Sequence, residues 1–159
     1  MTQVGKIEQR LIELGFPLPE VAKPVASYTP AVVSGNLVFT SGQLPFVNGA
    51  LPAAGKVGNT DGLVDPAEAK RLATLCALNA LAAVKLVIGD LDRVTRIVKV
   101  VGFVASVPEF TGQPGVMNGA SEFLAEVFGD AGVHARSAVG VPVLPLDSAV
   151  EVELIAEFA

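Results

Sequence analysis

The chain has little of what most metal and catalytic sites are built from. Its 159 residues include one cysteine, Cys76, and one histidine, His134. A single cysteine excludes an internal disulfide and fits a reducing compartment. These two side chains cannot form a zinc site between them, and no carboxylates recur at metal-ligand spacing. A Gly-x-Ser-x-Gly elbow, a phosphate-cradling loop and a dinucleotide-binding glycine pattern are also absent.

Charge is scarce as well. Charged residues make up 17% of the chain and hydrophobic residues 51%. A small domain with so few charges must expose apolar surface or cover it with copies of itself, which favours a homo-oligomer. The net charge is −5 and the isoelectric point is about 4.8. Long-range electrostatics therefore oppose binding to nucleic acid or to an anionic membrane.

The sequence contains no pattern typical of a leader or a membrane span. Acidic residues interrupt the N-terminal apolar positions, which excludes the hydrophobic region of a signal peptide. The most apolar stretch, residues 72–88, contains polar side chains and is shorter than the roughly 20 apolar residues that a span needs. We therefore expect a cytoplasmic protein that forms one domain over residues 1–159, with an extension over residues 1–27.

Apolar periodicity and turn residues predict the order of helices and strands. Asp65 is expected to cap a long helix, with Pro66 in the first turn and Glu68 at the capping-box position. Helices are predicted over residues 5–15, 65–88 and 116–128, strands over 31–33, 37–40, 94–104, 139–144 and 150–158, and a surface loop over 48–64.

This order predicts an α+β domain in which two helices pack on one face of a single mixed β-sheet. The first two strands are expected to form one hairpin, and the last two strands a second hairpin around residues 145–148. The strand over 94–104 has continuous apolar stretches, which are typical of burial on both faces. A neighbouring subunit can cover the face that has no helices.

Arg136 and Glu151 are the sharpest candidates for chemistry. Arg136 stands at the mouth of an apolar strand, where it is expected to pair with a carboxylate of the protein or of a ligand. Glu151 and Glu153 share one side of the last strand, which fits either a solvated face or a group that handles a proton or a water. In the predicted hairpin Arg136 lies opposite Glu157 and roughly 20 Å from Glu151. A site that uses both must then lie between subunits.

The other reactive side chains have ordinary structural interpretations. Cys76 lies in the middle of an apolar helix and is predicted to be a core residue. His134 is predicted to be a surface residue in a loop. Ser41 and Gly42 end a strand, and they form either a plain turn or a place where a hydroxyl and a backbone N–H approach a ligand.

Three separated motifs resemble those of the RidA family, the reactive intermediate deaminases of YjgF type. Residues 35–45 resemble the family's Gly-Asn-apolar-apolar-apolar-Thr-Ser-Gly-Gln-apolar-Pro. Residues 110–128, which include Asn118, resemble its second helix. The most specific part is the closing Arg-Ser-x-Val, Leu-Pro and Val-Glu-Val-Glu-x-Ile-Ala. The resemblance extends over residues 28–156, and the loop over 48–64 is longer than in compact members.

The resemblance implies a chorismate-mutase-like fold, assembled as a homotrimer with a cleft between each pair of subunits. It also implies hydrolysis of reactive enamines and imines, such as 2-aminoacrylate and 2-iminobutyrate, to 2-keto acids and ammonia. No cofactor and no metal are implied. The partners would be a small carboxylate-bearing imine, enamine or keto acid and further copies of the chain, with no nucleic acid and no membrane.

Site residues carry over position by position. By resemblance, Arg136 would hold the substrate carboxylate, and Glu151 would orient or deprotonate the water that attacks the imine carbon. Ala138 stands where compact members often have cysteine and would act through its backbone carbonyl. One extra residue separates Asn118 from Arg136. The remaining residues that would line the cleft are Tyr28, Ser41, Gly42 (through its backbone) and Asn118.

Three functions remain open at this point. They are an imine or enamine deaminase, a trimer that binds a small carboxylate without catalysis, and an endoribonuclease or translation inhibitor. Both of the first two use Arg136, but only the deaminase needs Glu151. The low isoelectric point and the absence of a basic stripe argue against RNA as a substrate.

Overall fold

The structure, a computed structural model, describes residues 3–21 and 27–159. Within these residues a five-stranded sheet has the order β1-β2-β5-β3-β4, in which only β3 and β4 are parallel. The strands are β1 (Ala31–Ser34), β2 (Leu37–Thr40), β3 (Val94–Ala105), β4 (Ala135–Val141) and β5 (Val150–Phe158). The helices are α1 (Lys6–Glu13), α2 (Pro66–Ile88) and α3 (Gln113–Phe128), with short 3-10 turns at Leu91–Arg93, Gly129–Gly132 and Pro145–Asp147.

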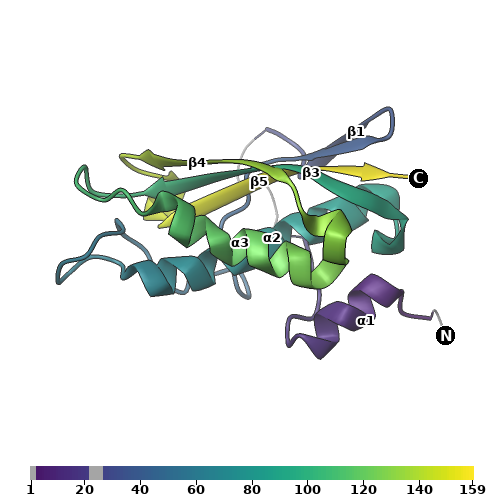
Figure 1. Ribbon diagram of the computed structural model, residues 1–159, viewed down its shortest axis with the longest axis horizontal. Coiled ribbons are helices and arrows are strands. Elements are labelled where there is room, and N and C mark those ends of the chain that lie inside the picture. The colour runs from purple at the N-terminus through teal and green to yellow at the C-terminus, as the bar shows by residue number, and fades with distance from the viewer. Residues whose placement is uncertain (1–2, 22–26) are drawn as a thin grey trace.

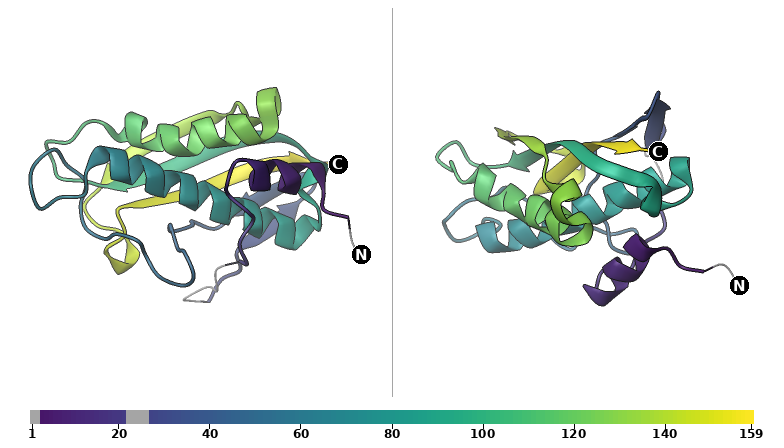
Figure 2. Two further views of the ribbon diagram at one scale, coloured as in Figure 1. Left: turned by 90° about the horizontal axis from the view of Figure 1, so that it is seen from below. Right: turned by 45° about the vertical axis from the view of Figure 1, so that its right-hand side comes forward.

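Both long helices lie on the same face of the sheet. Figure 1 shows α2 and α3 side by side below the strands, and the view from below in Figure 2 confirms that they run along the sheet. In the described residues no helix covers the opposite face, which we call the helix-free face. The predicted α+β architecture, with two helices on one face of a mixed sheet, is confirmed.

The core lies between α2, α3 and the sheet, and β5 shows how the sequence positions it. Val150, Val152 and Leu154 are at most 2% exposed, whereas Glu151 and Glu153 between them are partly exposed. Side chains alternate between the two faces of a strand, so the buried set faces the helices and the glutamates face away. The predicted sidedness of this strand is confirmed.

Helix α2 is built into this core. Asp65 caps its N-terminus as predicted, because its carboxylate accepts a hydrogen bond of 2.8 Å from the backbone N–H of Ala67. Glu68 instead forms an ion pair with Arg71 at 2.7 Å. The helix is long and apolar enough to cross a membrane, with a mean hydropathy of 1.7 over its most apolar window, but 72% of that window is buried within the fold. It is therefore a core helix.

The predicted hairpin of the last two strands is wrong. β4 starts at Ala135 and pairs in parallel with β3, so that Arg136 lies opposite Val100 rather than opposite Glu157. β5 instead inserts between β2 and β3. The reason is that β3, α3 and β4 form a crossover unit, which places β4 at the edge of the sheet. The turn around residues 145–148 then carries the chain past β3 instead of back along β4.

The expected loop over residues 48–64 contains neither a helix nor a long strand, but it is more than a surface loop. Val57 is fully buried. Its backbone N–H donates to the Ala105 carbonyl at 2.7 Å, and its carbonyl accepts from Val107 N–H at 3.2 Å. The ion pair between Lys56 and Asp147, at 3.2 Å, joins the loop to the turn before β5. The loop therefore extends the pairing at the end of β3.

The N-terminal extension is held by a cap that comes from far along the chain. The carboxylate of Asp92 accepts hydrogen bonds of 2.8 Å from the backbone N–H groups of Lys6 and Ile7 at the start of α1. Leu11 is fully buried, and the ring of Phe16 meets that of Phe123 edge-on, with centroids 5.3 Å apart. The extension is thus packed against the end of the helix layer (Figure 2).

We expect the Asp92→Ala substitution to loosen α1, because two N–H groups at its first turn lose their acceptor. Loss of an N-cap costs roughly 0.5–2 kcal/mol. Hydrogen exchange should therefore accelerate in residues 6–13 while the strands keep their protection. Asp61→Ala, in the exposed loop, is the control. Unchanged exchange in residues 6–13 would contradict the capping role.

Candidate functional site

Arg136 is held against α3 by neutral acceptors. Its Nη1 donates to Oδ1 of Asn118 at 2.9 Å and to Oγ of Ser121 at 3.1 Å. Its Nη2 donates to the backbone carbonyl of Pro114 at 3.3 Å. All three acceptors belong to α3, and the arginine comes from the second residue of β4. The structure therefore brings together two of the predicted site residues, Arg136 and Asn118.

Close packing of α3 on the sheet makes these contacts possible. Gly102 in β3 lies beside Ala138 in β4. A Cβ at Gly102 would come within 2.2 Å of the sulfur of Met117, so a larger residue would force the Met117 side chain of α3 to move. Met117 immediately precedes Asn118. The absence of a side chain at Gly102 thus lets α3 place its acceptors within reach of the guanidinium.

The remaining donors of Arg136 define a binding edge. A guanidinium offers two parallel pairs of N–H groups, Nη1/Nη2 and Nε/Nη2. Asn118 and Ser121 together match both hydrogens of Nη1, and Pro114 accepts from one of the two hydrogens of Nη2, which leaves the Nε–H group and one Nη2 hydrogen for a ligand. In residues 3–21 and 27–159 no carboxylate lies within ion-pair distance of Arg136. The side chain is partly exposed, so a ligand carboxylate can reach this edge.

Glu151 forms a second group with the residues that follow β2. A Cβ at Gly42 would lie 2.1 Å from Oε1 of Glu151, so the missing side chain leaves the space that the carboxylate occupies. Ser41 donates through its hydroxyl to the carbonyl of Thr29 at 2.6 Å. This bond fixes the segment that carries Tyr28, whose side chain is 49% exposed.

The environment of Glu151 favours its protonated form. Burial raises the pKa of this carboxyl above its usual value, and the charge of Glu153 on the same side of β5 raises it further. A carboxyl with a raised pKa exchanges protons closer to neutral pH, which suits a group that handles a water or a leaving nitrogen.

One chain does not bring Arg136 and Glu151 together. Arg136 lies beside Val100 of β3, whereas Glu151 lies beside Phe103, three residues further along that strand. Strand geometry places their backbones on the order of 14 Å apart. The odd offset also puts the side chains on opposite faces of the sheet. Ala138 shares the helix-covered face with Arg136, and its side chain packs against the core.

Sequence reasoning missed two residues of the Arg136 group. Ser121 had no assigned role, and His134 was predicted to be a surface residue. The structure shows His134 half-buried, with Nε2 at 2.9 Å from Oγ of Ser121 and Nδ1 at 2.7 Å from the carbonyl of Gly132. The spacing of these two residues from Asn118 and Arg136 in the sequence could have indicated their place. Ser121 follows Asn118 by one helical turn, and His134 precedes Arg136 by the two residues that return a strand to the same face.

Cys76 is a core residue, as predicted. It is fully buried in α2. Burial, followed by the charge of Glu151, raises the pKa of its thiol well above the usual value. The thiolate needed for a nucleophile or a metal ligand is therefore disfavoured. In the described parts of the chain, no group of three or more His, Cys, Asp and Glu side chains is placed to hold a metal ion.

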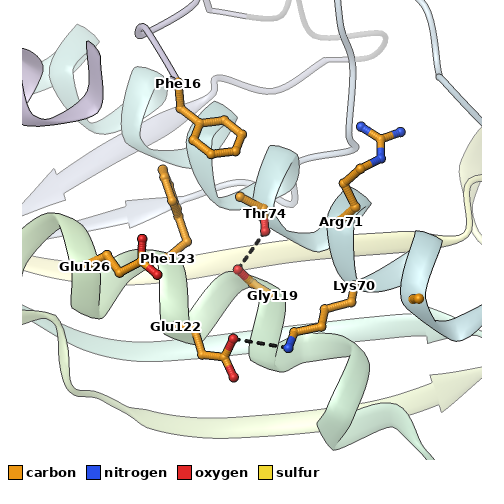
Figure 3. Close-up of a pocket in the computed structure, with 9 residues that line it drawn as sticks. Phe16, Lys70, Arg71, Thr74, Gly119, Glu122, Phe123 and Glu126 are labelled. Atoms are coloured by element: carbon orange, nitrogen blue, oxygen red, sulfur yellow. Dashed lines mark hydrogen bonds and ion pairs between the residues drawn. The ribbon is translucent and has the colours of Figure 1, made fainter. Parts of the chain in front are cut away.

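A groove between α2 and α3 is separate from both groups. Figure 3 shows it with Phe16 at one end and charged side chains along its walls, and its volume is about 320 Å³. Lys70 and Glu122 pair across it at 3.1 Å, and the hydroxyl of Thr74 donates to the carbonyl of Gly119 at 2.8 Å. These polar groups satisfy one another, so the groove is explained by helix packing.

Comparison with known proteins identifies the family. A family model described as "YjgF/chorismate_mutase-like, putative endoribonuclease" matches residues 8–158. The chain belongs to the YjgF/chorismate mutase-like family. Protein TCP17 of Trypanosoma cruzi is 41% identical over 154 residues, which cover 96% of this chain and 94% of that protein. The family includes RidA, so the resemblance found in the sequence is confirmed.

Solved structures support the same assignment. Atu1372 from Agrobacterium tumefaciens is 48% identical, with a TM-score of 0.88 over 96% of this chain and 92% of that one. TdcF from E. coli, which was crystallised with bound serine, shares the fold at 23% identity, with a TM-score of 0.59 and full coverage (100%) of both chains. The chorismate-mutase-like fold of this member of the YjgF family is thus established.

The site geometry makes a prediction about Glu151 that does not depend on function. Replacing Glu153 by Gln removes the nearby negative charge, so the pKa of Glu151 should fall toward its usual value while staying above it because of burial. Carboxyl carbon NMR over a pH titration measures this shift. Glu20→Gln, in the N-terminal extension, is the control. A Glu151 pKa that stays constant in Glu153→Gln would contradict the proposed coupling.

Proposed function

We propose that the protein is an enamine and imine deaminase, which hydrolyses reactive 2-imino and 2-enamino acids to 2-keto acids and ammonia. The observation that carries this proposal is the state of Arg136. Neutral acceptors hold its guanidinium, no carboxylate in the described residues pairs with it, and its Nε–H group and one Nη2 hydrogen remain on the Nε/Nη2 edge. This edge matches the two oxygens of a carboxylate. A substrate held there presents the carbon next to its carboxylate in a fixed position.

Glu151 is proposed to manage the protons of the reaction. Its carboxylate takes a proton from water as the water oxygen bonds to the imine carbon and the C=N electron pair moves to nitrogen, and the resulting carboxyl group passes this proton to the nitrogen. In the carbinolamine the carboxylate transfers the hydroxyl proton to the amino group, so that the C–N bond breaks, ammonia leaves and the C=O bond of the keto acid forms. An enamine enters the same path after a proton moves from its nitrogen to its β-carbon. Positioning of a water and the substrate supplies most of the required acceleration.

The proposed site lies between subunits of a homotrimer. Arg136 and Glu151 occupy opposite faces of one sheet, so a small substrate cannot contact both within one chain. The helix-free face also carries exposed apolar side chains: Val32 at 51%, Phe39 at 38% and Val139 at 44%. Burial of such a patch by further copies of the chain stabilises an assembly. The assembly would then place Glu151 of one copy near Arg136 of the next.

Binding without catalysis is the second candidate. TdcF shares this fold and holds serine, a small molecule with a carboxylate. The Arg136 group would be sufficient to bind a small carboxylate, because it needs no contribution from Glu151. The endoribonuclease activity named in the family description is less compatible with this chain, since a net charge of −5 opposes the approach of RNA.

The Arg136→Ala substitution should abolish most of the deaminase activity. A charged hydrogen-bonded pair contributes roughly 1.5–3 kcal/mol, so KM should rise on the order of ten- to a hundred-fold. The assay measures keto-acid release from 2-iminobutyrate or 2-aminoacrylate generated in situ, and light scattering checks that the assembly is intact. Arg71→Ala, on the exposed side of α2, is the matched control. Wild-type kinetics in Arg136→Ala would refute the role of the guanidinium.

The Glu151→Gln substitution separates catalysis from binding. The amide keeps the shape of the side chain but cannot accept the proton, so kcat should fall on the order of 100- to 10,000-fold. Binding of 2-oxobutyrate, measured by calorimetry, should change little. Glu126→Gln, exposed on α3, is the matched control. Full turnover by Glu151→Gln would contradict the role of Glu151 as the base.

A further inference from the structure

A continuous chain of hydrogen bonds extends from Arg136 away from its binding edge. Nη1 of Arg136 lies 3.1 Å from Oγ of Ser121, which lies 2.9 Å from Nε2 of His134. On the far side of the imidazole, Nδ1 lies 2.7 Å from the backbone carbonyl of Gly132. The chain joins β4, α3 and the 3-10 turn before β4.

The partners at the two ends determine the direction of every hydrogen bond. The Gly132 carbonyl can only accept, so Nδ1 of His134 must carry hydrogen. In the neutral imidazole Nε2 is then an acceptor, and the Ser121 hydroxyl donates to it. The Ser121 hydrogen is therefore directed at His134, and its oxygen lone pairs face Nη1 of Arg136, which can only donate. A single consistent arrangement results.

The surroundings of the ring favour this neutral form. α3 presents the Ser121 hydroxyl to it, the 3-10 turn presents the Gly132 carbonyl, and β4 presents Arg136, the charged group among the described residues that acts on the ring. Burial has the largest effect and lowers the pKa of His134. The hydrogen bond to the Gly132 carbonyl raises this pKa, the positive charge of Arg136 lowers it, and the net result is a lowered pKa. The imidazole thus remains an acceptor at neutral pH.

We propose that Ser121 and His134 are positioning residues of the Arg136 site, in which the imidazole fixes the Ser121 hydroxyl and the Ser121 oxygen fixes the guanidinium. The inference rests on the proposed function, because it takes Arg136 to bind the substrate carboxylate. Asn118 alone would engage one hydrogen of Nη1. With Ser121 it engages both, so the plane of the guanidinium is set and the Nε/Nη2 edge is the one presented to a two-oxygen anion.

A serine beside a histidine is also the arrangement of an activated nucleophile. In this chain the hydroxyl oxygen accepts a hydrogen bond from a guanidinium, and such a charge-assisted bond lowers the electron density available for attack. The contact therefore fits a role in holding Arg136 better than a role in covalent catalysis.

The first test uses the fact that His134 is the single histidine of the chain. In the intact protein labelled with ¹⁵N, long-range proton–nitrogen correlation spectra report the tautomer without assignment ambiguity. We expect the Nδ1–H form, with an apparent pKa below about 6.5. Saturating 2-oxobutyrate should raise that pKa, because a bound carboxylate offsets the charge of Arg136. An Nε2–H tautomer, or a pKa that does not respond to bound 2-oxobutyrate, would overturn the proposal.

The second test compares variants and separates their effects on KM from their effects on kcat. Ser121→Ala should weaken 2-oxobutyrate binding and raise KM by about ten-fold with little change in kcat, since the loss is in substrate positioning. Ser121→Thr, which keeps a hydroxyl, should restore most of the affinity, and Ser34→Ala, at the exposed end of β1, should have no effect. His134→Leu should match Ser121→Ala, and the double variant should lose no more than either single variant.

The outcomes separate this inference from the proposed function. If the affinity for 2-oxobutyrate depends on Ser121 but the protein does not turn over imines, the positioning role is supported and the deaminase proposal is contradicted. If Ser121→Ala turns over imines with an unchanged KM, the deaminase proposal is supported and the positioning role is contradicted. A wild-type protein that does not bind 2-oxobutyrate removes the positioning role too, because there is then no anion site to position.

Discussion

The strict alternation of side chains along β5 is the constraint on which the rest of the structure depends. Val150, Val152 and Leu154 must face α2 and α3, because their burial builds the core. Glu151 is then committed to the helix-free face. Arg136 is committed to the other face by its contacts with α3. The same hydrophobic pattern that stabilises the fold thus separates the two groups of candidate residues and makes assembly a condition for joining them.

The acceptors around Arg136 are neutral, so they form hydrogen bonds with its partly buried guanidinium without neutralising its charge. Carbonyl and hydroxyl oxygens compensate part of the cost of desolvating the guanidinium, yet they leave its net positive charge in place. A carboxylate of the protein at the same position would have neutralised that charge and occupied the edge. Among the described residues no carboxylate neutralises the charge of Arg136, and Gly102 leaves the space in which the Met117 side chain of α3 packs.

Local signals were sufficient for much of the fold and for less of the site. The Asp65 cap, the β1–β2 hairpin and the alternation of β5 are encoded within a few residues, and all three are confirmed. The pairing of β4 depends instead on which sheet edge the crossover after α3 reaches, and the apparent hairpin turn around Leu146 and Asp147 was misleading. His134 was missed for a related reason, because its partner Ser121 becomes a neighbour only once α3 lies on β4.

The division of the candidate residues between opposite faces has a genetic consequence. In the proposed trimer, each cleft takes its arginine from one chain and its glutamate from another. A chain lacking only the arginine and a chain lacking only the glutamate, each inactive alone, would regain intact clefts when co-assembled. Two defective alleles would thus complement each other, and the unit on which selection acts would be the pair of adjoining surfaces rather than the single polypeptide.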